Sequence, residues 1–174
     1  MNFNRARSAC LHVLGLALVG IAQLHGVTAF VSGDISTGSH WTNGLPNVGN
    51  NGSIAVPGTL GEINFGNSSA GTVTVSHTAG TITGSGTINM YNTGSALYQW
   101  TQSGGIVSAS NFMVINDRVT YELTGTGSIH FAVATTGGSR LQVVNAGAWV
   151  QSGGTTDGIA LAFENPSGRR IFFR

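Results

Sequence analysis

One short sequence occurs twice in this chain, and its spacing constrains the fold more than any other feature. Residues 100–105, Trp-Thr-Gln-Ser-Gly-Gly, return as Trp-Val-Gln-Ser-Gly-Gly at residues 149–154, 49 positions later. Weaker copies between and before them each place a glycine at the same phase. These glycines are residues 58, 80, 105, 127 and 154, with spacings of 22, 25, 22 and 27. A mean repeat of about 24 residues is typical of stacked units, whereas an antiparallel sandwich gives no reason for it.

Short runs in which apolar and polar residues alternate indicate strands rather than helices. Each run has one apolar face and one face rich in small polar residues, as expected of a half-buried strand. Asn-Gly steps at residues 43–44 and 51–52 supply the tight turns between such runs. The apolar positions are Val73 and Val75; Val119, Tyr121 and Leu123; Ile129, Phe131 and Val133; and Ile159, Leu161 and Phe163.

The repeat and the alternation together predict an all-β fold, a right-handed parallel β-helix of roughly four to five short coils. Three short strands and three turns use a couple of dozen residues, and each coil rises by one strand spacing of about 4.8 Å. We expect residues 58–174 to form the coils, cut short at the C-terminal end, and residues 30–57 to form an N-terminal edge or cap segment. An antiparallel β-sandwich is the alternative.

Composition excludes two other classes of protein. Glycine, threonine, serine and asparagine make up 70 of the 145 residues after position 29, which leaves too few strong helix formers for a helical bundle. The same segment has 5 arginines and 6 acidic residues, a net charge of −1. A nucleic-acid partner is therefore not expected, because binding to a phosphate backbone requires a cationic surface.

Residues 1–29 have the order of features that is typical of a secretory signal peptide. Arg5 and Arg7 precede an apolar run at residues 11–22, and small residues at Val27 and Ala29 fit a cleavage site after Ala29. The apolar run is shorter than the roughly 20 residues that span a bilayer, which argues against a membrane anchor. A buried N-terminal helix is the remaining alternative. We expect an extracellular or outer-surface protein without a membrane span, and without cysteine once Cys10 has left with the signal.

The segment after this signal resembles a known group of proteins. Trp41-Thr42-Asn43-Gly44-Leu45-Pro46-Asn47, followed by repeats of Gly-Thr-hydrophobic and by Gln-x-Gly-Gly turns at residues 102–105 and 151–154, resembles secreted bacterial β-solenoid proteins. These carry autotransporter-associated β-strand repeats, many of them with a PEP-CTERM sorting tail. The resemblance covers most of residues 34–160. It implies a parallel β-helix displayed outside the cell and no catalytic residues. Residues 165–174 contain neither a sorting tail nor a β-barrel translocator, which predicts a fragment or a product released after export.

The charged residues form no recognisable catalytic or metal-binding set, so we expect no enzyme, no metal and no cofactor. Asp117 and Glu122 are the nearest carboxylate pair, but Asp117 beside Arg118 predicts an exposed turn. Residues 153–158 resemble a calcium-binding repeat only loosely and occur once. His130 is expected to face solvent. The rival interpretation, a polysaccharide-degrading β-helix enzyme, would require long loops that build a cleft.

Trp100 and Trp149 are the candidate ligand-binding residues, because exposed aromatic rings two coils apart could stack on sugars. By the glycine phase, their equivalent is Val75 in an earlier coil, which the alternation places inside, and Glu122 in the coil between them, which it places outside. Tryptophan is highly buried on average, so we expect both rings to point inward. The predicted function is a non-catalytic structural module, a stalk or passenger-like segment. The alternative is a carbohydrate-binding or adhesive surface, with an extracellular polysaccharide or a neighbouring cell-surface protein as partner.

Overall fold

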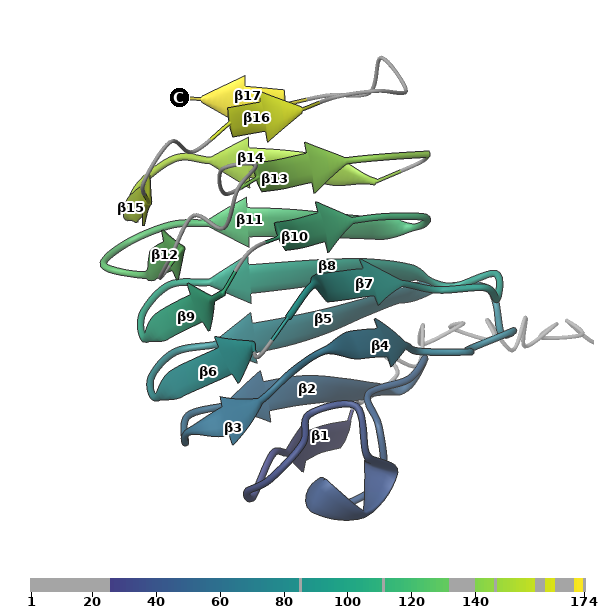
Figure 1. Ribbon diagram of the computed structural model, residues 1–174. Coiled ribbons are helices and arrows are strands. Elements are labelled where there is room, and N and C mark those ends of the chain that lie inside the picture. Colours follow the sequence, from purple (N-terminus) through teal and green to yellow (C-terminus); the bar gives the residue numbers. More distant parts are fainter. Residues whose placement is uncertain are drawn as a thin grey trace, which may run out of the picture.

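The computed structural model describes residues 26–84, 86–110, 112–131, 140–145, 147–158, 162–164 and 171–173. Their strands wind into a solenoid with three parallel sheets (Figure 1). Sheet 1 contains, in spatial order, β1 (Gly26–Ala29), β2 (Asn50–Ile54), β5 (Thr72–His77), β8 (Leu97–Gln102), β11 (Val119–Leu123), β14 (Ala148–Gln151) and β17 (Ile171–Phe173). Sheet 2 contains β3 (Gly58–Thr59), β6 (Thr81–Gly84), β9 (Ile106–Ala109), β12 (Ser128–Phe131) and β15 (Thr155–Gly158). Sheet 3 contains β4 (Glu62–Asn64), β7 (Ile88–Tyr91), β10 (Phe112–Ile115), β13 (Arg140–Val143) and β16 (Ala162–Glu164).

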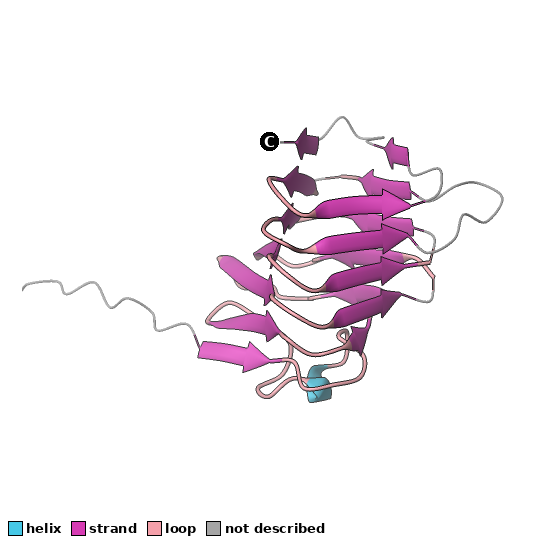
Figure 2. Cartoon of the chain, turned by 90° about the vertical axis from the view of Figure 1, so that its left-hand side faces the viewer, coloured by secondary structure: helices cyan, strands magenta, loops and turns pink. Residues whose placement is uncertain are grey.

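The pairing of these strands confirms the predicted β-solenoid and excludes the antiparallel sandwich. From β2 onward each strand hydrogen-bonds to the strand three places later in the chain, up to the pairs that end in β15, β16 and β17, whereas β1 bonds to β2. Every such pairing is parallel. The chain therefore passes through all three sheets before it returns to the first, and it completes about five turns. Among the described residues the one helical element is the short 3-10 turn η1 (Gly38–His40), which lies at the β1 end of the stack (Figure 2). The described part of the chain contains no helix long and apolar enough to cross a bilayer.

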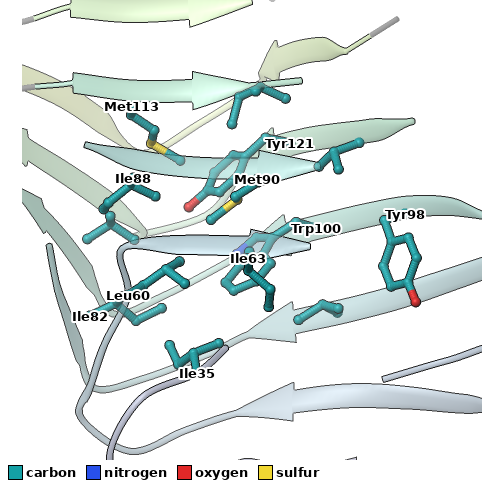
Figure 3. Packing of buried hydrophobic residues seen from close by; sticks show 14 of the residues in the cluster. Ile35, Leu60, Ile63, Ile82, Ile88, Met90, Tyr98, Trp100, Met113 and Tyr121 are labelled. Atoms are coloured by element: carbon teal, nitrogen blue, oxygen red, sulfur yellow. The ribbon is translucent and has the colours of Figure 1, made fainter. Parts of the chain in front are cut away.

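The alternating residues of the sequence fill the interior, because in-register stacking brings equivalent side chains above one another. In sheet 3, Ile63, Met90 and Ile115 form one such column, and all three are buried. In sheet 2, Ile82, Val107 and Ile129 form another. Figure 3 shows apolar side chains of this kind, including Met90, Trp100 and Tyr121, gathered between the sheets. The interior is thus a continuous packed core.

The predicted phase of the repeat is correct at four of the five glycines and wrong at Gly58. Register aligns Gly80, Gly105, Gly127 and Gly154 at the corner between sheets 1 and 2. Gly58 instead pairs with Ile82, two positions out of phase. At Gly105 a Cβ atom would lie 2.6 Å from the carbonyl oxygen of Gly80, so the stacked corner leaves no room for a side chain. This close approach explains why glycine recurs there.

The predicted equivalence of Glu122 with the two tryptophans is also wrong. Tyr121 pairs with both Trp100 and Trp149, while Glu122 pairs with Thr101 and Val150 on the outer face. The error arises at the corner after β11, which has four residues (124–127), whereas the corner after β8 has three (103–105). Counting five residues back from Gly127 therefore gives Glu122, one residue after the true equivalent, Tyr121. A shift of one residue exchanges the two faces of a strand.

The stack begins earlier in the chain than residue 58. β2 lies within residues 30–57 and pairs with both β1 and β5, so the stacked strands extend to the N-terminal side of residue 58. The alternation of apolar and polar residues could not identify this strand, because its central inward residue is Gly52. A Cβ atom there would lie 2.6 Å from Cγ of Pro46 and 3.2 Å from the Trp41 ring. The side chains that fill the space come from the preceding segment. The predicted strand positions Val133, Ile159 and Leu161 lie outside the described residues.

Candidate functional site

Trp100 and Trp149 lie in the core, as the sequence led us to expect, and they are joined there by Tyr121. Their exposed fractions are 1% and 0%. The ring of Tyr121 stacks between them, with centroid distances of 6.1 Å to Trp100 and 5.1 Å to Trp149 and interplanar angles of 12° and 11°. We call these three residues the aromatic column. No face of the column reaches solvent, so it stabilises the stack and offers no surface to a sugar.

The repeated glutamine is explained by a second column, at the corner between sheets 1 and 2. The Nε2 group of Gln102 donates to the carbonyl oxygens of Gly105, at 3.2 Å, and of Ser128, at 3.0 Å. Gln151 makes the same turn contact with Gly154, at 3.5 Å. In the earlier coil His77 takes this position, with its Nε2 atom 3.3 Å from the carbonyl oxygen of Gly80. Gln-x-Gly-Gly is therefore a corner motif, in which an inward polar side chain satisfies a buried turn carbonyl.

Aromatic and corner columns meet at one hydrogen bond. The hydroxyl of Tyr121 donates to Oε1 of Gln102 at 2.5 Å, and both groups are buried. Burial raises the pKa of Tyr121 far above its ordinary value, because the phenolate would be desolvated. Burial also raises the pKa of Tyr98 to about 12. These tyrosines are therefore neutral hydrogen-bond donors at any physiological pH.

His77 makes the corner sensitive to acid. Burial lowers the pKa of its imidazole below 6.5, because the charged form would lose its hydration. As pH falls below about 6.5, the unfolded chain binds a proton at His77 that the folded chain takes up only at lower pH. We therefore expect the free energy of unfolding to fall between pH 7 and pH 5.5, and His77→Gln to remove part of that fall. Glutamine fits because Gln102 occupies the same place one coil later.

Chemical denaturation at several pH values measures this effect. His130→Gln is the matched control, because His130 lies outside the core with 54% of its side chain exposed. We expect the control to retain most of the wild-type pH dependence. An unchanged pH dependence in the His77→Gln variant would contradict the assignment.

Three residues with catalytic potential share one row on the outer face of sheet 2. Register aligns Ser108 of β9, His130 of β12 and Asp157 of β15. Nδ1 of His130 lies 2.5 Å from Oδ1 of Asp157, and the Asp157 side chain is 65% exposed. No hydrogen bond joins Ser108 to His130 in the described structure. A nucleophile needs that contact with its base, so the row as it stands is a surface hydrogen-bond pair next to a serine.

A shallow depression surrounds Leu97 on the outside of the solenoid. Leu97 is 53% exposed and lines two hollows of about 310 and 520 Å³. One hollow extends over sheet 1 and the other over the preceding corner. Their linings, apart from Leu97, are Thr72, Tyr98, Gln99 and Thr120 in the first and Asn92, Thr93, Asp117 and Arg118 in the second. The Leu97 depression therefore combines one protruding apolar side chain with hydroxyl, amide and charged groups.

The carboxylates named from the sequence take up separate positions. Arg118 has a left-handed backbone, φ 61°, and its Nη1 group lies 3.4 Å from the carbonyl oxygen of Ser95, so residues 117–118 form the predicted turn. Glu122 lies on the outer face, where its Oε2 atom accepts from Nε2 of Gln99 at 3.3 Å. Among the described residues, no three histidine or acidic side chains gather closely enough to hold a metal ion.

Comparisons with protein-family models, with curated protein sequences and with solved structures find no match to this chain.

Sequence reasoning missed the Leu97 depression. Leu97 is the outward residue at the start of β8, and only the register of three coils brings Thr72 beside Leu97 and Thr120 beside Gln99. The proximity of His130 to Asp157 was missed for the same reason, since the two residues are 27 positions apart. Both arrangements depend on the lengths of corners, which short turn sequences do not define.

Proposed function

We propose that this protein is a non-catalytic structural β-solenoid module that is exported and works at the cell surface or outside the cell, as a stalk or passenger-like segment. The resemblance to secreted bacterial β-solenoid proteins, with autotransporter-associated repeats, belongs to the same proposal. The observation that carries it is the distribution of the large side chains: all three tryptophans are 4% exposed or less. The tryptophan rings, which on a surface could bind ligands, therefore pack in the core.

Two further features support a structural role. The outer faces of β5 and β6 carry only threonine and serine, which suits a surface in contact with solvent. The N-terminal end is closed by Phe30, Ile35 and Trp41, all buried, with the Trp41 ring nitrogen donating to the carbonyl oxygen of Ile35 at 2.8 Å. A closed end and a regular stack are what a spacer between other parts requires.

Fractionation of a Gram-negative bacterial host that expresses the full chain tests this proposal. We expect the protein outside the cytoplasm, and we expect an Arg5→Glu/Arg7→Glu variant to stay inside, because the positive n-region is lost. Incubation of the exported protein with plant and bacterial polysaccharides should release no reducing sugar. Wild-type protein in the cytoplasm would contradict the proposed export, and sugar release would favour the polysaccharide-degrading enzyme.

The Leu97 depression favours one second candidate, a surface that binds a neutral polysaccharide. Sugars present apolar ring faces and many hydroxyl groups, and the depression offers Leu97 for the former and Thr72, Gln99 and Thr120 for the latter. Its two charged groups, Asp117 and Arg118, have opposite signs, so they do not select for a charged ligand. The proposal of glycan binding depends on this depression and not on the tryptophans.

Affinity electrophoresis against neutral polysaccharides tests the second candidate. If the depression binds sugar, Leu97→Ala should weaken binding roughly 10- to 100-fold, as expected for the loss of one apolar contact. Ile106→Ala is the matched control, because Ile106 is also an exposed apolar residue, at 42%, but lies on sheet 2. Equal retardation of the Leu97→Ala variant and the wild type, or no retardation of either, would contradict binding at this place.

A further inference from the structure

The strand β1 lies inside the segment that the sequence predicts to be removed. Its four residues pair in parallel register with β2, from Gly26 with Asn50 to Ala29 with Ser53. Thr28 points inward and has an exposed fraction of 0%. β1 is thus the outermost strand of sheet 1 and is part of the folded stack (Figure 1).

The segment Trp41–Gly44 covers the other edge of β1. Ala29 and Thr42 exchange two hydrogen bonds of 2.9 Å, one from the backbone N–H of Ala29 to Oγ1 of Thr42 and one from the backbone N–H of Thr42 to the Ala29 carbonyl. Oγ1 of Thr28 donates to the carbonyl oxygen of Gly44 at 2.9 Å and accepts from the backbone N–H of Asn43 at 3.1 Å. The Trp-Thr-Asn-Gly segment is therefore held in place by hydrogen bonds to β1.

A cut after Ala29 would remove all of these partners. It would uncover the β2 edge that β1 now pairs, and it would leave Thr42 and Asn43 without the hydrogen bonds that hold them. An open parallel edge is a template for association with other chains. The folded structure is therefore consistent only with processing that leaves Gly26–Ala29 in the mature chain.

We propose that signal peptidase cuts after Ala22, so that the mature protein begins at Gln23 and retains β1. Water hydrolyses the Ala22–Gln23 peptide bond, which gives a carboxylate on Ala22 and a free amine on Gln23. Gly20 and Ala22 supply the small residues at positions −3 and −1, and the apolar run that remains before them falls within the 7–15 residues of an h-region. Between this run and β1, no other cut has small residues at both positions. The inference rests on the proposed export.

Mass spectrometry of the exported full-length chain tests the position of the cut. Intact mass and peptide mapping should place the N-terminus at Gln23, either free or cyclised with loss of ammonia. An N-terminus at Phe30 would overturn the inference while leaving export intact. A chain that retains Met1 in the cytoplasm would instead overturn the proposed export, and the cut with it.

Two matched variants separate the candidate positions. Ala22→Gln places a large residue at −1 of the proposed site and should reduce the processed fraction at least several-fold. Ala29→Gln makes the same change at the other site, where the side chain is exposed on β1, and should leave processing unchanged. The opposite pattern, with Ala29→Gln blocking the cut, would overturn the inference.

Discussion

Replacing Trp149 by alanine is expected to lower the free energy of unfolding by roughly 3–5 kcal/mol, the loss typical of a large aromatic side chain in a core. Trp149 is fully buried and stacks on Tyr121 at 5.1 Å. The small residues that are common in this chain offer few side chains that could move into the space. Equilibrium denaturation with urea measures the change.

The outer neighbour of Trp149 on the same strand provides the control. Val150 lies on the other face of β14, pairs with Glu122 and is partly exposed. Val150→Ala should therefore lower the free energy of unfolding much less than Trp149→Ala, because surface substitutions disturb little packing and core substitutions disturb much. Equal losses in the two variants would mean that the column is not a packed core.

Trp41→Ala is expected to lower the free energy of unfolding by a similar amount, roughly 3–5 kcal/mol, because it removes the ring that closes the N-terminal end. The Trp41 ring packs edge-on against Phe30, with centroids 5.5 Å apart, and lies over Gly52. Loss of the ring loosens the segment that covers the edge of β1, so we also expect concentration-dependent association. Denaturation and sedimentation velocity measure the two effects.

Trp41→Phe separates packing from hydrogen bonding at this end. Phenylalanine retains an aromatic ring but cannot donate to the carbonyl oxygen of Ile35, which Trp41 does at 2.8 Å. We expect the free energy of unfolding to fall less than in Trp41→Ala. The lost hydrogen bond should cost about 1–3 kcal/mol, the smaller ring should add a further loss of packing, and the protein should stay monomeric. Association of the phenylalanine variant at the same concentration as the alanine variant would contradict the role assigned to the ring.

Repeats and alternation were sufficient to predict the class of fold, because both follow directly from stacking. A column such as Val75, Trp100 and Trp149 requires apolar residues at intervals of one or two coils, and the sequence has them. Corner lengths were harder to derive. One extra residue after Leu123 made Glu122, and not Tyr121, the predicted equivalent of the two tryptophans, although the glycine phase itself was correct there.

Segments whose packing partners come from elsewhere were the least predictable. β2 has a glycine at its central inward position, because Pro46 and Trp41 fill that space. The inward polar residues Gln102 and His77 look like surface residues in a pattern of hydrophobicity, yet both are fully buried. Their partners are the carbonyl oxygens of the corner, which no alternation of side chains reveals.

Tryptophan fluorescence tests the central claim most directly, namely that the aromatic residues of this solenoid form its core and not a binding surface. The chain contains three tryptophans, and all of them are buried, so the whole signal reports on the interior. We predict emission that is blue-shifted relative to tryptophan in water, weakly quenched by acrylamide and unchanged when polysaccharide is added. Red-shifted, readily quenched emission that responds to polysaccharide would contradict the claim.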